Sequence, residues 1–440
     1  MLVNIHKHTL VIAFILFNYT IVFAQEDKTF SSLKEVLDVA KIKNNSLKNA
    51  SLQQRVANLN ITTSKWNTIN PKIPTSLQGI NNMKQQLSFL PGQTFGLPQG
   101  SYKEVIIGQQ YVTTFNIQPQ FDIFNLSNIN SVKTAKANLQ LLENQNKINE
   151  QTLFEKINAV YFNILSFQAQ KDVISEHLKI AQQIKDITEN KFNEGIIRKQ
   201  DVNEAAVNLI LVQDKLEQLE TNIKIQYQLL NLFLNNQINS ILIESIWDYK
   251  KGETNIKTSN NLQTQNAVLQ TQVAQLEFKS LKYQNLPVLS FVSSFNWQNL
   301  SNKNLVSNNS NWIDYNYVGF KLSYDLPTTV QKVNNVKSKQ IQLQILKNNE
   351  EQSQKENEQN NVQLVIEYNR YLKQVDNNQK VYLLKKDTYE KSYNQYIENI
   401  LPLSQLLITQ TDLLNSKINV IAALTNIGYY KNKIDINNEY

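Results

Sequence analysis

Side chains that could support catalysis or hold a metal ion are scarce in this chain. It has three histidines, His6, His8 and His177, and no cysteine. The common zinc sites and the Cys–His or Ser–His nucleophile pairs draw on these two residue types. His6 and His8 lie in an N-terminal targeting pattern, and a lone histidine in a helical pattern, such as His177, is more often a core or solvated residue. We therefore expect no catalytic residue, no metal site and no enzyme activity.

Other ligand-binding patterns are missing as well. The nine glycines form neither a GxGxxG nor a GxxxxGK motif, so no phosphate loop is expected. Met83 is the single methionine after Met1, which gives no support to a thioether relay for metal ions. The formal net charge is +7, but the basic residues are scattered. We expect no cofactor and no nucleic-acid partner.

The N-terminus has the pattern of an export signal. The basic residues His6-Lys7-His8 precede an apolar run from Thr9 to Phe23, which ends Val22-Phe23-Ala24 with small or modest side chains at the positions that a signal peptidase needs. This pattern predicts a secretory signal peptide over 1–24, cleaved after Ala24. The alternative is an N-terminal membrane anchor, but a spanning helix needs about 20 apolar residues and this run is shorter.

Proline placement predicts very long helices. All eight prolines lie outside 120–286 and 328–401, and proline costs about 3 kcal/mol inside a helix. Apolar residues recur at three- and four-residue spacing from about 127 to 190. A helix of about 64 residues would be roughly 95 Å long. Such a helix is typical of a coiled coil, because an isolated polar-faced helix has little to stabilise it.

The next segment carries a heptad pattern, which predicts a second helix over about 200–236 that folds back on the first. Gly195, in the turn between them, suits a left-handed helix cap. Asp201 is expected to serve as the N-cap of the second helix or to favour its positive end. The heptad positions are Val202, Ala205, Leu209, Val212, Leu216, Leu219 and Ile223.

Four segments alternate between apolar and polar residues as strands do. They cover about 73–80, 111–123, 289–298 and 318–326, the first being the weakest. One aromatic face and one polar face are typical of transmembrane barrel strands, although the edge of a soluble sandwich can look alike. Four strands cannot close a barrel, and lipid does not tolerate open edges. We therefore expect three copies to pool twelve strands.

The same order of elements occurs twice, which indicates a tandem duplication. Phe192-x-x-Gly195 corresponds to Tyr396-x-x-Asn399, and asparagine tolerates the left-handed conformation. The first repeat spans 25–245, with a β-hairpin at about 71–125 and helices at about 127–190 and 200–236. The second spans 246–440, with a helix at about 256–284, a β-hairpin at about 287–327, and helices at about 329–396 and 402–430.

In this arrangement the chain resembles the TolC-like family of outer-membrane efflux proteins. The resemblance rests on Ser32-Leu33-Lys34-Glu35-Val36-Leu37, the junctions Asn70-Pro71 and Leu286-Pro287-Val288-Leu289, the helix turn from Phe192 to Ala205, and the strand from Val318 to Pro327. The order and duplication of these weak motifs make the match fairly specific.

The resemblance implies a mainly α fold with a small β part. Long antiparallel coiled-coil helices would form a periplasmic tunnel, and four strands per chain would contribute to a trimeric 12-stranded transmembrane β-barrel. It also implies a homotrimer in outer-membrane lipid, a periplasmic adaptor (membrane fusion) protein and an inner-membrane transporter. The channel would passively export small molecules or polypeptides in a tripartite efflux or type I secretion system.

The resemblance further implies that the helix turns form a periplasmic tip, where the adaptor docks or the tunnel is gated. The tip residues are Phe192, Gly195, Asp201, Tyr396, Glu398, Asn399 and Gln405. Some family members carry an acidic ring on the second tip helix, but Gln405 and Ile408 are uncharged here. Glu398 could supply three charges to a trimer instead. The competing hypothesis is a secreted or periplasmic coiled-coil protein that never enters a membrane.

Overall fold

A computed structural model describes residues 28–235, 240–249, 261–306, 312–326 and 328–440. The predicted signal peptide, residues 1–24, lies outside them. The chain divides into two compact units, and each is described here by itself. The first unit comprises Met1–Ala50, Asn146–Leu262 and Glu356–Tyr440, and the second comprises Ser51–Gln145 and Gln263–Lys355.

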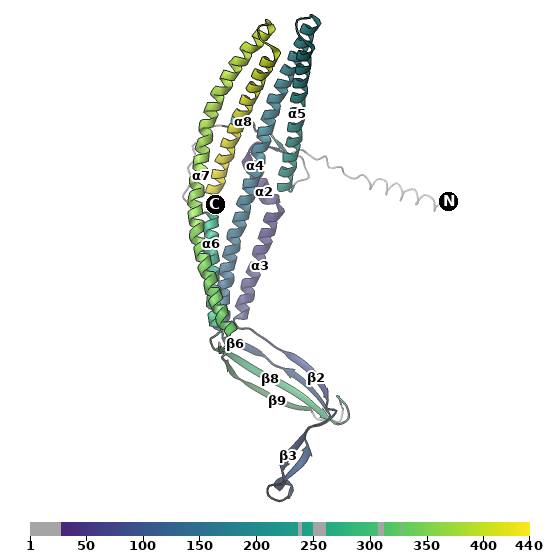
Figure 1. Cartoon of the computed structure of the whole chain (residues 1–440). Coiled ribbons are helices and arrows are strands. Elements are labelled where there is room, and N and C mark those ends of the chain that lie inside the picture. Colours follow the sequence, from purple (N-terminus) through teal and green to yellow (C-terminus); the bar gives the residue numbers. More distant parts are fainter. Residues whose placement is uncertain (1–27, 236–239, 250–260, 307–311, 327) are drawn as a thin grey trace, which may run out of the picture. The chain divides into compact units, whose positions relative to one another are not determined.

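Helices dominate the chain, and the two longest have the same length (Figure 1). α4 and α7 each contain 68 residues, as the proline-free stretches predict. The helices are α2 Leu33–Lys43, α3 Asn45–Asn67, α4 Leu126–Asn193, α5 Lys199–Phe233, α6 Leu262–Tyr283, α7 Val330–Ile397 and α8 Leu403–Glu439. None of the helices in the described ranges is long and apolar enough to cross a membrane.

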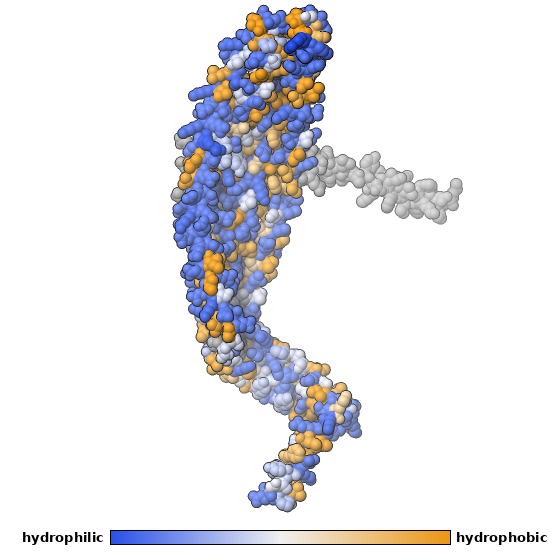
Figure 2. Space-filling model, viewed as in Figure 1, coloured by the Kyte–Doolittle hydropathy of each residue, from blue (hydrophilic) through white to orange (hydrophobic). Residues whose placement is uncertain are grey.

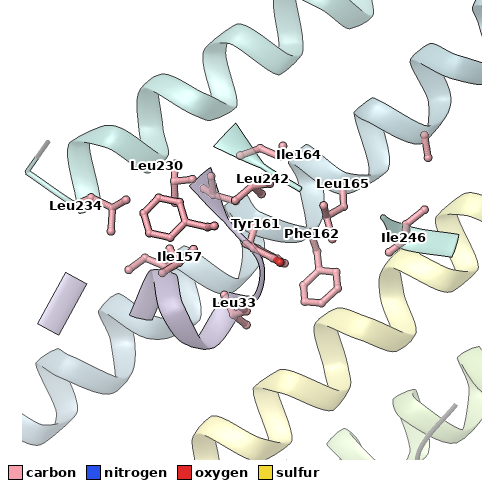
Figure 3. Packing of buried hydrophobic residues seen from close by; sticks show 14 of the residues in the cluster. Leu33, Ile157, Tyr161, Phe162, Ile164, Leu165, Leu230, Leu234, Leu242 and Ile246 are labelled. Carbon is pink, nitrogen blue, oxygen red and sulfur yellow. The ribbon is translucent and has the colours of Figure 1, made fainter. Parts of the chain in front are cut away.

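The first unit has a core around the middle of α4 (Figure 3). Tyr161, Ile157 and Ile164 on α4 are fully buried. Leu33 of α2, Leu230 and Leu234 of α5 and Ile246 of the short helix η2 (Ile246–Asp248) surround them. A two-stranded parallel sheet, β1 (Lys28–Phe30) with β7 (Ser240–Leu242), adds Phe30 and Leu242 to this core. The alternation pattern did not predict this sheet, because each strand has only three residues.

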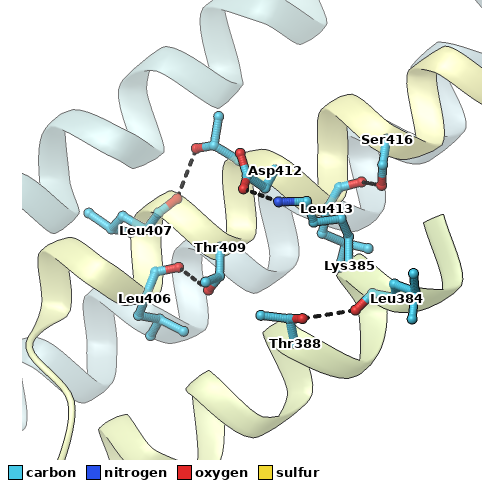
Figure 4. A network of polar contacts seen from close by, with 10 residues as sticks. Leu384, Lys385, Thr388, Leu406, Leu407, Thr409, Asp412, Leu413 and Ser416 are labelled. Carbon is cyan, nitrogen blue, oxygen red and sulfur yellow. Dashed lines mark hydrogen bonds and ion pairs between the residues drawn. The ribbon is translucent and has the colours of Figure 1, made fainter. Parts of the chain in front are cut away.

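The heptad residues of α5 and their counterparts on α8 face the interior of the first unit. Val202, Leu219, Leu406 and Val420 are all buried. Polar side chains between such positions bond within their own helix or to the neighbouring one (Figure 4). Thr409 donates to the carbonyl of Leu406, and the Nζ of Lys385 on α7 lies 2.6 Å from a carboxylate oxygen of Asp412 on α8. The α7–α8 pair is therefore held by apolar packing with the Lys385–Asp412 ion pair at its margin.

The second unit contains the main antiparallel sheet, in the order β2-β5-β8-β6 with β9 also paired to β8. Its strands are β2 Thr75–Asn81, β5 Tyr111–Ile117, β6 Gln120–Phe124, β8 Val288–Ser301 and β9 Trp312–Ser323. β5 and β6 pair with successive parts of β8, so together they correspond to one predicted strand that is interrupted before Gln120. Pro119 lies in the interruption, and proline cannot donate a ladder hydrogen bond.

The structure adds a second hairpin where the sequence pattern suggested one hairpin over 71–125. β3 (Leu87–Pro91) and β4 (Tyr102–Ile106) pair with each other and not with the main sheet. The short helix η1 (Gly92–Phe95) connects them together with a loop. The prolines and glycines of this segment lie in and around these short strands.

Candidate channel wall and helical tip

The main sheet has one apolar face whose aromatic rings are in register across the strands. Phe121 of β6, Phe291 of β8 and Phe320 of β9 lie opposite one another. Ring centroids are 4.9 Å apart for Phe121–Phe291 and 5.9 Å for Phe291–Phe320. Phe320 is nevertheless 72% exposed. A sheet that stacks large aromatic residues and leaves them open is suited to face a non-aqueous environment or a partner.

The opposite face is polar and its side chains bond to one another. Asn116 of β5 donates to Ser294 and Asn296 of β8. Ser290 donates to a carboxylate oxygen of Asp122 at 2.8 Å, farther along β8. The buried side chains of β8 are serines and asparagines on both faces: Ser290, Ser294 and Asn296 lie on the polar face, and Ser293, Asn299 and Ser301 lie between the aromatic residues of the other face.

The sheet ends on two unpaired edges within the described residues. β2 pairs only with β5, and β9 pairs only with β8. All seven residues of β2 are exposed, and so are eleven of the twelve residues of β9. Their free N–H and C=O groups are a template for another strand.

A buried carboxylate ties the sheet to the helices of the second unit. Asp122 is 6% exposed and accepts hydrogen bonds from Asn70 at 3.2 Å and Asn125 at 2.9 Å, besides the one from Ser290. The side-chain oxygen of Asn125 in turn accepts from the N–H of Asn128 in the first turn of α4. Asp122 therefore fixes the geometry at which the strands pass into α4, and polar donors compensate for its burial.

The helical turns of the first unit have the predicted backbone geometry. Gly195 has a φ of +78° and Asn399 a φ of +60°. The N–H of Gly195 donates to the carbonyl of Phe192, and the N–H of Asn399 donates to the carbonyl of Tyr396, so the two turns are built alike. The prediction that Asn399 replaces glycine at a left-handed position is confirmed.

Lys191, in the last turn of α4, links the two turns and was not singled out from the sequence. Its Nζ donates to the carbonyl of Tyr396, to the carbonyl of Ile397 at 3.2 Å and to the side-chain oxygen of Asn399 at 2.7 Å. It also lies 4.2 Å from the centre of the Tyr396 ring. The Lys191 side chain thus neutralises the carbonyl end of α7. Burial lowers the pKa of Lys191 below its ordinary value.

The hydroxyl of Tyr396 adds a second link between the turns. It lies 2.9 Å from the hydroxyl of Thr188 on α4, and burial raises the pKa of Tyr396. A lysine in a last helical turn is a weak sequence signal, and its acceptors lie more than 200 positions away. Pattern reading therefore could not pair Lys191 with Asn399.

The remaining predicted tip residues do not take part in the contacts of Lys191 and differ in their surroundings. Phe192 is 37% exposed, with the Nζ of Lys199 5.4 Å from its ring centre. Glu398 and Gln405 are exposed. The prediction of Asp201 as an N-cap is wrong, because α5 begins at Lys199 and Arg198 is the N-cap. Asp201 instead accepts a hydrogen bond from the N–H of Arg198 at 3.0 Å, which favours the positive end of α5 as the alternative prediction stated.

A cleft of about 450 Å³ lies between the two turns. Its lining includes Ile196, Asp201, Tyr396, Asn399 and Ile400. Ile196 is 49% exposed and Ile400 is 72% exposed, and Figure 2 shows hydrophobic side chains in orange at the helix-hairpin ends. Across the described ranges, no group of three or more His, Asp or Glu side chains could hold a metal ion. The tip therefore presents exposed apolar side chains beside a cleft.

Solved structures of outer-membrane channels share this fold. VceC of Vibrio cholerae is 12% identical, with a TM-score of 0.69 over 91% of this chain and 94% of VceC. The open state of MtrE of Neisseria gonorrhoeae is 13% identical, with a TM-score of 0.70 over 92% of this chain and 88% of MtrE. CmeC of Campylobacter jejuni is 16% identical, with a TM-score of 0.66 over 92% of this chain and 84% of CmeC. The predicted fold class, mainly helical with a small β part and an internal duplication, is confirmed.

The sequence itself matches the outer membrane efflux protein family over residues 36–236. No curated protein sequence matches the chain. The family match lies within the first repeat, and the fold match extends over the whole chain. Together they confirm the predicted resemblance to the TolC-like outer-membrane efflux proteins. They also agree with the predicted outer-membrane localisation with a long periplasmic extension.

Proposed function

We propose that the protein is a passive, homotrimeric outer-membrane channel that forms the outer component of a tripartite efflux or type I secretion system. It would export small molecules or polypeptides and perform no chemistry itself. The helices would line a periplasmic tunnel that leads into the barrel. A periplasmic adaptor would dock on the helical end, and an inner-membrane transporter would supply the energy.

The main sheet carries this proposal. Its polar face is internally bonded, its aromatic face is exposed, and both of its edges are open. In lipid every backbone group must be paired, so an open sheet is not tolerated. With β5 and β6 counted as one strand, each copy contributes four, and pairing β2 of one copy with β9 of the next closes twelve strands around the polar face. That exceeds the minimum of about eight strands for a known barrel.

The helical tip is the proposed adaptor site and gate. Phe192, Gly195 and Asp201 belong to one turn, and Tyr396, Glu398, Asn399 and Gln405 belong to the other. Exposed Ile196 and Ile400 beside the cleft give a partner apolar anchoring points. Glu398 is exposed, so three copies would present three carboxylates there. Unchanged single-channel ion selectivity in a Glu398→Gln variant would contradict a role for this ring.

The decisive experiment is to extract the mature protein from outer-membrane fractions and measure its mass by light scattering with detergent subtracted. We expect a detergent-requiring trimer with heat-dependent electrophoretic mobility that forms ion-conducting pores in planar bilayers. A detergent-independent monomer or dimer in the periplasm or medium would mean that the strands do not enter lipid. The secreted coiled-coil hypothesis would then replace the channel.

A further inference from the structure

The β3–β4 hairpin has one covered face and one open face. Leu90 and Val105 are only partly exposed; η1 lies next to these strands, and the Nζ of Lys103 is 4.7 Å from the ring centre of Phe95 in η1. The pairs Leu87–Ile106, Phe89–Glu104 and Pro91–Tyr102 lie on the other face. This second set of six residues is called the open face.

The open face is mostly apolar, and its side chains are exposed. Exposure is 49% for Leu87, 61% for Phe89, 69% for Tyr102 and 59% for Ile106. Glu104 is its only charged residue. A two-stranded hairpin is marginally stable by itself in water. Packing these large apolar side chains against another surface would remove them from water and stabilise the hairpin. The composition of this face is therefore that of an interaction surface.

The position of the hairpin indicates what covers it. The hairpin follows the edge strand β2, and only residues 82–86 separate the two. In the proposed trimer, β2 lies at a subunit boundary, so three hairpins stand at three equivalent boundaries around one rim. Twelve strands spaced about 4.8 Å apart and tilted by about 40° give a barrel radius of roughly 12 Å.

The hairpin is long enough to reach its copies. Each of its strands has five residues, which span about 17 Å at about 3.4 Å per residue. The four residues from Ile107 to Gln110 add up to about 13 Å of connector. The three hairpins can therefore meet across a mouth of roughly 12 Å radius.

We propose that the open faces of the three β3–β4 hairpins pack against one another and form a clasp over the end of the barrel remote from the helices. The occupant of the open face is thus a second copy of this chain. Glu104 stands opposite Phe89 in the middle pair of the open face, so the clasp must leave its carboxylate in contact with water, because burying an unpaired carboxylate is unfavourable. This inference rests on the proposed trimeric channel and adds a closure at its outer mouth, made by contacts between subunits.

The absence of cysteine makes a clean test possible. Phe89→Cys or Tyr102→Cys on the open face, in the full-length channel reconstituted in proteoliposomes, should give intersubunit dimers with a mild oxidant or a short bis-maleimide. Lys103→Cys, on the covered face, is the matched control and should give at least fivefold less dimer. In planar bilayers, Phe89→Asp should raise the single-channel conductance at least twofold, whereas Lys103→Asp should not.

The trimer mass of each variant separates this inference from the proposed function. If no trimer forms even in the unmodified chain, the channel proposal itself fails. If the trimers conduct but the thiols introduced at positions 89 and 102 react rapidly with an impermeant maleimide and form no dimers, the clasp is refuted. If the two introduced thiols are instead inaccessible to the maleimide and form no dimers, the open face lies against lipid, and the clasp is refuted as well.

Discussion

At the scale of single residues, Lys191 shows how a charge can be buried without a carboxylate. It is 8% exposed, and three oxygen atoms at the end of α7 and in the turn after it accept hydrogen bonds from its Nζ. A helix C-terminus carries a partial negative charge, so a cation is favoured there. The same contacts hold the two turns of the tip together within one subunit.

Replacing Lys191 with Met should loosen the second turn. The variant leaves the carbonyls of Tyr396 and Ile397 and the Asn399 side chain without their donor, at a cost of about 1–3 kcal/mol. We expect faster hydrogen–deuterium exchange over residues 394–401, measured by mass spectrometry. Lys199→Met, at an exposed lysine of the other turn, is the control. Equal exchange in both variants would show that the Lys191 contacts do not hold the tip.

His177 should make stability depend on pH. It is 4% exposed, and burial lowers its pKa from 6.5 to about 4. The unfolded chain therefore takes up the proton first, and the free energy of unfolding should fall as the pH drops from about 6.5 to about 4. The loss would be at most about 3 kcal/mol per chain, and stability above about pH 6.5 should be unaffected by this group.

The measurement is the midpoint of thermal unfolding by circular dichroism in detergent between about pH 7.5 and about pH 4.5, a window chosen to bracket the titration. His177→Gln should remove most of the slope in this window. Glu176 provides an internal contrast, because its hydrogen bond to Lys417 lowers its pKa from 4.5. The contribution of the ionised Glu176 carboxylate to the free energy of unfolding is therefore lost only at a pH below this window. A slope that persists unchanged in His177→Gln would mean that other groups cause it.

At the scale of elements, close approach of α8 to α4 depends on Gly428. A β-carbon at this position would lie 2.1 Å from the ring of Phe162, which is itself buried. The packing between these helices therefore requires glycine for space and not for backbone freedom. Figure 3 shows Phe162 pointing from α4 toward α8 (yellow).

Gly428→Ala should destabilise the fold by about 1–3 kcal/mol through overpacking. Thermal unfolding monitored by circular dichroism should show a lower midpoint. The double variant Gly428→Ala with Phe162→Leu creates room and should recover part of the loss. A single variant as stable as the parent would mean that the two helices separate easily at this point.

At the scale of the whole molecule, the proposed membrane insertion requires the aromatic face of the sheet to meet lipid and the polar face to line the channel. Adjacent residues of β8 point to opposite faces, so Trp297 and Gln298 are a matched pair. Trp297 stacks on Phe115 at 5.6 Å on the aromatic face. The side-chain amide of Gln298 donates to Thr114 on the polar face.

Trp297→Lys should block assembly, because a lysine on the lipid face costs about 2–4 kcal/mol per copy near the bilayer centre. Gln298→Lys should assemble normally and shift single-channel selectivity toward anions. The yield of heat-modifiable trimer and the reversal potential in a salt gradient measure these outcomes. The opposite result, with Gln298→Lys failing to assemble, would reverse the assignment of the two faces.

The sequence by itself determined the features that depend on local pattern. Proline-free stretches predicted α4 and α7, heptad spacing predicted the buried face of α5, and the positive φ of Asn399 followed from its alignment with Gly195. These features rest on backbone sterics and side-chain periodicity, which act over a few residues. The alternation of β8 likewise indicated a sheet with two different faces.

Only the tertiary structure decided which distant residues meet. Lys191 and Asn399 are far apart in sequence, Asp122 collects donors from the segment after α3, from β8 and from the start of α4, and β1 pairs with β7 through strands of three residues. The open face of the β3–β4 hairpin depends on strand register. Such contacts depend on how the chain folds back on itself, and short-range sequence patterns do not predict which distant segments become neighbours.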